Sequence, residues 1–374
     1  MASVPAAAGL SIPGVGLAAQ SSKIDGVQIG VITYSFRQGV DKKDLPSVIQ
    51  KIGLSEVELM SGDAEIIAGM PSAGGGGGFG GPGGGRGGSG GRGGGRGGSG
   101  GGGFGGRGGG NAALAPNGCP ANSPSGQDSL AKSGQAPARG GGFGGGGGRA
   151  MTPEQEAAQK AIADWRMAAK ASTWKGLRQK FNDVGVDVQI LCYNMNLNTK
   201  DDEIEYAFQM ARDLGVRAIS CSATVAVAKR VAPFADKYKI MWGGHGHADI
   251  FDDEQFATPE TFKKIMSFSK YIGVNLDIGH FTAAGFDPLT FIPEVHDRIT
   301  NIHLKDRMKP DKCYNSANVV WGTGQTPIRD VLLLMKKNKY KFPANIEFEY
   351  QTPAGSDSVI EVTKCYEFIK KCFA

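Results

Sequence analysis

Four short stretches of this 374-residue chain combine an apolar run with residues that can bind metals or move protons. In MWGGHGHADIF (241–251), His245 and His247 stand one residue apart, which puts both rings on one face if the strand extends that far. Such a pair is a candidate for metal binding, because neutral imidazole is a common ligand. The other three stretches are NLDIGH (275–280), NIHLKD (301–306) and NIEFEY (345–350).

Strand geometry predicts which of these side chains meet, since every second side chain of a strand points to the same side. His303 and Lys305 share a face, Glu347 and Glu349 share another, and Asp277 ends its strand. Buried charges are costly unless they are paired or bound to a cation. Asp277, His303 and Glu347 would supply a site for one divalent ion: Mn²⁺, Mg²⁺, Co²⁺ or Zn²⁺. The alternative makes His303 a hydrogen-bonded core residue, Glu347 the partner of Lys305, and Asp277 the cap of a turn.

The elements that must position these residues are short β-branched strands alternating with helical patterns, which favours a parallel α/β fold. Eight strand-and-helix pairs are predicted, the number that closes a (β/α)8 TIM barrel, in which chemistry lies at the carboxyl ends of the strands. The open doubly wound sheet is the alternative, but no dinucleotide-type glycine pattern follows the first strand. We expect one barrel domain over residues 23–374, with strands at 27–33, 56–60, 186–193, 216–222, 238–243, 274–279, 299–306 and 344–350.

Residues 74–149 are rich in glycine and arginine, and they carry too little apolar surface to offset the entropy of folding. We expect a disordered insertion between the second strand and its helix, either a tolerated loop or a loose attachment to an anionic polymer, a surface or a partner chain. The segment holds seven basic residues and one acidic residue, so the rest of the chain has a formal charge of −1 out of a total of +5. The barrel lacks the basic surface of a nucleic-acid-binding protein, and we expect no such partner.

Residues 1–22 form a small-residue apolar segment like the back half of a secretory signal, without its positive start. This pattern predicts export to the periplasm or the medium, with a flexible tail on a cytoplasmic protein as the alternative. No second apolar run is long enough to span a bilayer. The six cysteines show no zinc-site spacing, and a chain of this length does not need disulfides to fold.

Six stretches, taken in order, resemble the xylose-isomerase-like TIM barrels known as sugar phosphate isomerase/epimerases: GVITYSF, EVELM, NLDIGH, NIHLKD, WGTGQTPIRDVLLLMKKNKY and IEFEY. The resemblance covers the chain apart from its start and the insertion. It implies a divalent metal on Asp277, His303 and Glu347, a substrate contact at His280, and a pocket position for Glu58. The implied partner is a small carbohydrate substrate, and a homo-oligomer stays open.

The sequence departs from this family where a glutamate ligand ends the fifth strand. Gly243 stands at that position, and His245 stands where a histidine follows in the family. We expect His245 to replace the missing ligand and to serve as a base, and His247 to be a pocket or loop histidine.

Without a carboxylate at position 243, Glu347 is the preferred base for removing a proton beside a carbonyl, with Lys305 as an electrophile or ion-pair partner. Glu349 or His280 is a candidate for the second proton transfer. The predicted function is a metal-dependent isomerase or epimerase of a sugar or keto-sugar. The alternatives are a lyase that performs β-elimination on a 3-keto-glycoside, and a non-catalytic sugar-binding or scaffold protein that uses the Gly/Arg-rich segment. An abasic-DNA nuclease with this barrel would need three zinc ions, which five histidines and a nearly neutral barrel do not favour.

Overall fold

The computed structural model describes residues 21–71, 115–119, 123–133 and 152–374. Residues 1–20 of the predicted N-terminal segment 1–22, and most of the predicted insertion 74–149, lie outside these residues.

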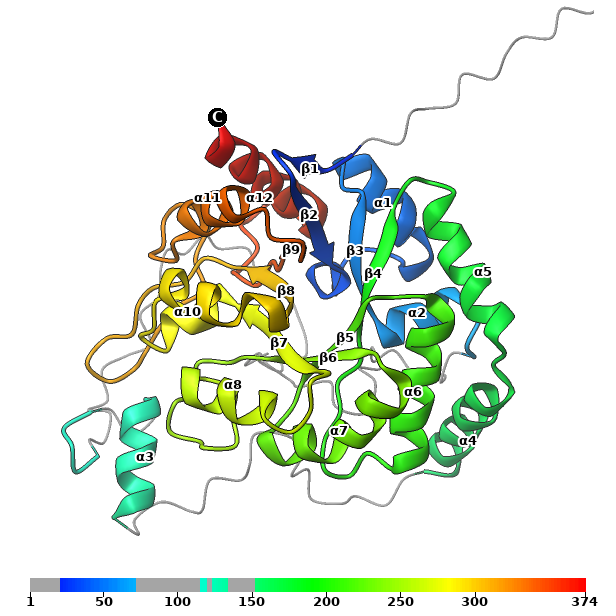
Figure 1. Ribbon diagram of the computed structural model, residues 1–374, viewed down its shortest axis with the longest axis horizontal. Coiled ribbons are helices and arrows are strands. Elements are labelled where there is room, and N and C mark those ends of the chain that lie inside the picture. The colour runs from blue at the N-terminus through cyan, green and yellow to red at the C-terminus, as the bar shows by residue number, and fades with distance from the viewer. Residues whose placement is uncertain (1–20, 72–114, 120–122, 134–151) are drawn as a thin grey trace, which may run out of the picture.

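Eight parallel strands form a closed barrel (Figure 1). Each strand pairs with the next one in chain order, and the last pairs with the first, where Gly30 lies opposite Asn345. The predicted (β/α)8 barrel is thereby confirmed, and the open sheet is excluded. The strands are β2 (Val27–Ile32), β3 (Glu56–Met60), β4 (Asp187–Cys192), β5 (Ala218–Ser222), β6 (Met241–His245), β7 (Ile272–Asp277), β8 (Ile299–Leu304) and β9 (Ala344–Ile346), and a short β1 (Lys23–Ile24) runs antiparallel to β2.

Helices surround the barrel (Figure 1), and most of them bury apolar side chains in one common core. In α6, for example, Ile204, Ala207, Phe208 and Ala211 are buried at helical spacing, and Gly215 ends the helix at φ 71°. No helix in the described part of the chain has both the length and the apolar character needed to cross a bilayer. Around the barrel lie α1 (Leu45–Ile52), α2 (Ser61–Ile67), α4 (Pro153–Ala168), α5 (Ala171–Asn182), α6 (Asp201–Leu214), α7 (Val225–Tyr238), α8 (Pro259–Met266), α9 (Ile278–Ala283), α10 (Pro288–Val295), α11 (Ile328–Asn338) and α12 (Ser358–Phe373), with 3-10 turns η1 (Thr33–Phe36), η2 (Lys42–Asp44) and η3 (His296–Arg298).

Strand β6 lies further along the chain than the predicted 238–243. The preceding helix α7 continues to Tyr238 and ends at Lys239, which has a left-handed backbone at φ 54°. The strand therefore begins at Met241 and includes His245 as its last residue. This shift makes His245 part of the barrel wall rather than of a loop.

The barrel interior near the amino ends of the strands is filled by polar side chains. Asn345 Nδ2 lies 2.5 Å from Glu56 Oε2, and a Cβ atom at Gly30 would lie 1.5 Å from the same oxygen. A side chain at position 30 would have to displace the buried Glu56 carboxyl group, which occupies that space. Burial and the neighbouring charge of Glu58 raise the pKa of Glu56 well above its ordinary value.

Part of the predicted insertion has structure. Residues 123–133 include helix α3 (Pro124–Lys132), and Cys119 forms a disulfide with Cys313 in the loop between β8 and α11. The Ser125 amide also donates to the Cys313 carbonyl oxygen at 3.3 Å. At these residues the structure differs from the prediction of disorder, and two of the six cysteines form a cross-link that a chain of this length was not expected to need. The insertion also starts after α2, a short helix that the sequence pattern did not predict.

Candidate metal centre and active site

Four neighbouring strands bring the predicted ligands together at their carboxyl ends. His245 ends β6, Asp277 ends β7, His303 is next to last in β8, and Glu347 directly follows β9. Asp277 and His303 are paired in register, so their side chains lie at the same height in the barrel. Each of the four residues is buried and offers one ligand atom, and these four atoms all lie within 4.8 Å of one another. The fold thus collects two imidazoles and two carboxyl groups at the end of the barrel where TIM-barrel enzymes carry their chemistry.

His303 lies between two carboxylates. Its Nδ1 is 2.9 Å from Glu347 Oε2, and its Nε2 is 2.6 Å from Glu58 Oε2. Burial alone would lower the pKa of His303, but the charges of Glu58 and Glu347 outweigh it and raise the pKa well above the ordinary value. A carboxylate on the far side of a histidine ring is the arrangement that orients metal-binding histidines in proteins.

Glu58, for which the family resemblance implies a pocket position, lies against His303. The side chain is fully buried, and besides His303 its oxygens accept hydrogen bonds from Ser220 Oγ, from Asn275 Nδ2 at 3.3 Å and from Asn301 Nδ2 at 2.7 Å. Both carboxylate oxygens are therefore occupied by protein donors. This environment suits a residue that holds His303 in place.

Lys305 neutralises the carboxyl groups of the cluster. Its Nζ lies 3.0 Å from Asp277 Oδ2, 3.0 Å from Glu347 Oε2 and 2.7 Å from Glu349 Oε2. Burial lowers the pKa of Lys305, but the three carboxylates outweigh it and raise the pKa above its ordinary value. Lys305 is therefore a permanent ammonium group, which agrees with the expected ion-pair partner. Burial raises the pKa of Glu347 but is outweighed by Lys305 and His303, so this carboxyl group is ionised.

Two buried atoms of the cluster lack hydrogen bonds among the residues that the structure describes. They are His245 Nδ1 and Asp277 Oδ2, although the Lys305 ammonium lies near the latter. Asp277 Oδ1, in contrast, accepts the His280 amide at 2.7 Å and so caps helix α9. Burial lowers the pKa of His245 well below its ordinary value, so the ring is neutral, the form that binds metals. Burial raises the pKa of Asp277 to about 6. A buried cation would supply the missing partner of His245 Nδ1 and a further partner, beside Lys305, for Asp277 Oδ2.

Gly243 has no room for a side chain. A Cβ atom there would lie 2.3 Å from Thr300 Oγ1 and 3.0 Å from the Asn275 amide nitrogen. His245 lies two residues further on, and its ring centre is 4.7 Å from that of His303. The donor that β6 contributes to the cluster is thus His245, at the end of the strand.

The remaining predicted residues lie around the cluster. The ring of His280 is 6.0 Å from that of His245 and 5.2 Å from that of His247. Glu349 is the most exposed of the acidic groups near Lys305, at 21% of its side chain. One residue was missed by the sequence analysis: Arg307, whose Nη1 lies 2.5 Å from His280 Nδ1. The alternation that puts His303 and Lys305 on one face reaches Arg307 when it is continued by two more residues.

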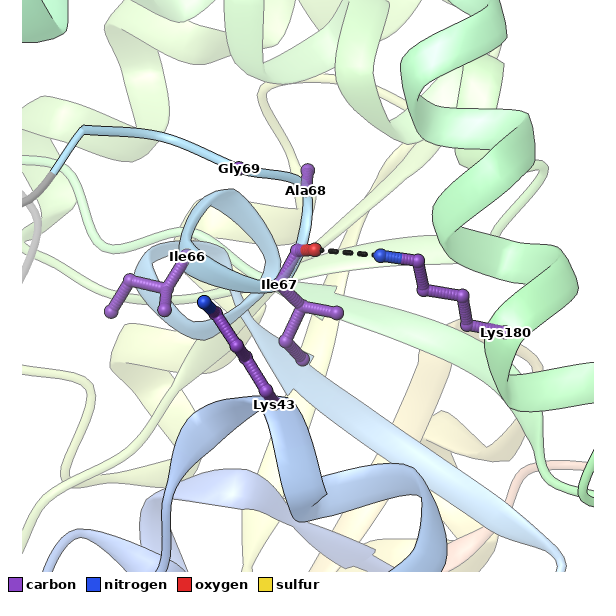
Figure 2. Close-up of a pocket in the computed structure, with 6 residues that line it drawn as sticks. All are labelled: Lys43, Ile66, Ile67, Ala68, Gly69 and Lys180. Carbon is purple, nitrogen blue, oxygen red and sulfur yellow. Dashed lines mark hydrogen bonds between the residues drawn. The ribbon is translucent and has the colours of Figure 1, made fainter.

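A separate hollow of about 360 Å³ lies beside helix α2 (Figure 2). Lys180 reaches across and donates from Nζ to the Ile67 carbonyl oxygen at 2.9 Å, so this lysine caps the end of α2. None of the cluster residues lines the hollow, and its lining residues include no carboxylate, histidine or cysteine. It is lined by Lys43, Ile66, Ile67, Ala68, Gly69 and Lys180.

This barrel with polar residues at its strand ends has relatives in sequence and in structure. The sequence model of the xylose isomerase-like TIM barrel family matches residues 145–366, and the chain belongs to this family. The resemblance noted in the sequence is thereby confirmed. No curated protein matches the chain in sequence.

Solved structures share the whole barrel at low sequence identity. A sugar phosphate isomerase/epimerase from Parabacteroides distasonis has 13% identity and a TM-score of 0.51, over 95% of this chain and 98% of that one. A xylose isomerase domain containing protein from Salmonella typhimurium has 9% identity and a TM-score of 0.52, over 92% and 98%. A probable 3-DHS dehydratase from Bacillus anthracis has 10% identity and a TM-score of 0.51, over 92% and 98%. At these identities the similarity establishes the fold.

Proposed function

We propose that this protein is a divalent-metal enzyme that isomerises or epimerises a small sugar or keto-sugar by removing a proton beside a carbonyl group. The observation that carries the proposal is the buried cluster of His245, Asp277, His303 and Glu347, in which two polar atoms lack hydrogen bonds. Membership of the xylose isomerase-like family and the shared fold of a sugar phosphate isomerase/epimerase support it.

The four cluster residues are the proposed ligands of one metal ion. Two imidazoles with two carboxylates suit Mn²⁺, Co²⁺ or Zn²⁺ better than Mg²⁺, which prefers oxygen ligands. His303 would lose a ring proton when it binds the ion, because only the neutral ring is a ligand. Such an ion would act as a Lewis acid on substrate oxygens. Glu58 would hold His303 in the orientation that binds the ion, through the 2.6 Å contact between Oε2 and Nε2.

Glu347 is the proposed base. Its carboxyl group is ionised beside Lys305, so it can accept a proton from the carbon next to the carbonyl. The same proton returned to the neighbouring carbon gives an isomer once the hydroxyl proton has passed to the former carbonyl oxygen. A proton delivered to the opposite face of the original carbon gives an epimer. Lys305 would stabilise negative charge on Glu347 before the transfer, and Glu349, which is more exposed, is the proposed second proton carrier.

A β-elimination lyase is the second candidate, because β6 contributes His245 and has no space for a carboxylate at Gly243. With one strand-end base, the enzyme would remove a proton beside the ketone of a 3-keto-glycoside. The electron pair would form a carbon–carbon double bond as the leaving group departs from the next carbon. The two candidates share the first proton transfer and differ in whether a leaving group is released.

Elemental analysis of the purified protein tests the metal site. We expect one divalent ion per chain, and Asp277→Ala and His303→Ala should each lose it, because each removes a ligand. His296→Ala is the matched control, since its ring stacks on Tyr340 away from the cluster, and it should keep the ion. Unchanged metal content in both ligand variants would refute the site.

Hydrogen exchange on carbon tests the reaction without knowledge of the product. In D2O the enzyme should place deuterium on the carbon beside the carbonyl of an accepted aldose, ketose or keto-glycoside, which NMR detects. Glu347→Gln should abolish this exchange. Release of an aglycone together with an unsaturated keto-sugar would assign the lyase, and exchange without release would assign the isomerase or epimerase.

We further propose that the protein is exported. The pairing of Cys119 with Cys313 supports this, because disulfides persist mainly in oxidising compartments. Cell fractionation should find the protein outside the cytoplasm. Thiol labelling before reduction should leave these two cysteines unlabelled, because they are paired with each other. Recovery from the cytoplasm with both cysteines labelled would contradict the proposal.

A further inference from the structure

Both main-chain groups of Arg307 form hydrogen bonds, and its side chain contacts one histidine, His280. Its amide donates to Thr326 Oγ1 at 3.0 Å, and its carbonyl oxygen accepts the Gln325 amide at 2.9 Å. The guanidinium then reaches back, with Nη2 donating to the Ser316 carbonyl oxygen at 3.2 Å and Nη1 lying 2.5 Å from His280 Nδ1. The side chain is half-buried, so the contact is partly protected from water.

The chemistry of the two groups fixes the direction of this hydrogen bond. An arginine guanidinium has five N–H donors, no acceptor, and does not lose its proton in proteins. His280 Nδ1 must therefore be the acceptor and carry no hydrogen. A neutral imidazole with a bare Nδ1 carries its hydrogen on Nε2. We propose that Arg307 is a positioning residue that holds His280 as an Nε2–H donor.

This assignment limits what His280 can do in the proposed reaction. The meaning of the tautomer for catalysis rests on the proposed function. With Nδ1 occupied and Nε2 protonated, His280 is neither a base nor a metal ligand. Nitrogen atoms of His245, His247 and His280 lie within 4.8 Å of one another, close enough to hold an ion. The Nε2–H tautomer held by Arg307 excludes His280 as a ligand at such a site. The His280 amide also binds the proposed ligand Asp277, which keeps the Nε2–H donor beside the metal site.

The partner of His280 is therefore an oxygen that accepts a hydrogen bond. The carbonyl or hydroxyl oxygen of a sugar next to the reacting carbon has this property, and negative charge develops on it when the proton is removed. A fixed neutral donor stabilises that charge without giving up its proton. The geometry thus points to a substrate that carries an oxygen acceptor next to its metal-binding oxygen.

Nitrogen-15 NMR of protein labelled at histidine tests the tautomer directly, because two-bond couplings distinguish Nδ1–H from Nε2–H. The chain has five histidines, and the His280 signals are assigned by their loss in His280→Gln. We expect an Nε2–H pattern in the wild type, a shift toward Nδ1–H in Arg307→Met, and recovery of the wild-type pattern in Arg307→Lys, which keeps a donor. An Nδ1–H pattern in the wild type, or an unchanged pattern in Arg307→Met, would overturn the inference.

Arg298→Met is the matched control for the loss of a half-buried arginine. Arg298 Nη2 donates to the main-chain oxygens of Met266 at 3.1 Å and Ser269 at 2.6 Å. Neither hydrogen bond involves a histidine. This variant should leave the His280 signals unchanged. Its thermal stability shows how much of any Arg307→Met effect comes from general weakening of the fold.

Metal content and turnover give two further outcomes. Zinc or cobalt bound at two ions per chain, with one lost in His280→Ala, would overturn the inference, and equal content in both proteins would support it. Arg307→Met should lower the rate of deuterium exchange about 100-fold, as expected when a donor is misdirected, and Arg307→Lys should restore it. The NMR and metal measurements need no substrate, so wild type without exchange activity would reject the proposed function while leaving the tautomer assignment intact.

Discussion

Glu56 and Glu58 stand on the same face of β3 but have different partners. Glu58 contacts the His303 ring at 2.6 Å, whereas Glu56 receives its hydrogen bond from Asn345. We expect Glu58→Gln to weaken metal binding about 10- to 100-fold, because a histidine ligand loses the carboxylate that orients it. Titration against a coloured chelator measures this change. Glu56→Gln is the matched control from the same strand, and an equal loss in both variants would contradict the role given to Glu58.

Glu56 itself carries a pH prediction. Its pKa in the folded protein is raised by burial, so the unfolded chain ionises at lower pH than the native state does. The contribution of Glu56 to the free energy of unfolding therefore falls as pH rises above the ordinary glutamate pKa. Glu56→Gln removes that dependence. The free energy of unfolding of the variant, relative to that of wild type, should therefore be higher at pH 8 than at pH 5. Denaturant titrations at both pH values measure it, with exposed Glu260→Gln as the control.

At the scale of elements, β6 and its neighbours are packed too closely for a side chain at Gly243. A Cβ atom would lie 2.3 Å from Thr300 Oγ1. Gly243→Ala should therefore lower the free energy of unfolding by about 1–3 kcal/mol, as overpacked cores do, and should weaken metal binding by displacing His245. Gly176→Ala in α5 is the control, since a Cβ atom there meets nothing within 4 Å. Equal stability of the two variants would show that Thr300 moves aside easily.

The elements that the sequence predicted are those with a local signal. Period-two alternation placed His303 and Lys305 on one face, and the order of strands placed Asp277 beside them, as the barrel shows. Contacts that join distant residues had no such signal. The burial of Glu58 depends on donors from three other strands, and the pairing of Cys119 with Cys313 spans 194 residues.

At the scale of the whole molecule, the disulfide ties the segment before helix α3 to the loop that follows β8. Its removal in the double variant Cys119→Ser, Cys313→Ser should lower the free energy of unfolding by about 2–4 kcal/mol, because a cross-link restricts the unfolded chain. Thermal unfolding should show a reductant-dependent Tm in the wild type and none in the double variant. A wild-type Tm that is the same with and without reductant would contradict the prediction.

The scaffold alternative makes the Gly/Arg-rich segment the working part of the protein. Deleting residues 74–114 tests it and keeps α3 and the disulfide in the chain. Because the proposed catalytic residues all lie in or near the barrel strands, we expect deuterium exchange to survive the deletion. Exchange lost while metal content and Tm stay at wild-type values would favour a role for the segment in the reaction.

The long span of the disulfide also affects how the protein is made. During synthesis Cys119 appears well before Cys313, and Cys192 and Cys221 appear between them as competing thiols. In the finished barrel both competitors are buried, so folding of the central strands removes them from exchange. Correct pairing therefore requires that the barrel form before oxidation is complete. A host that oxidises the nascent chain too early should accumulate mispaired protein, and a disulfide isomerase should rescue it.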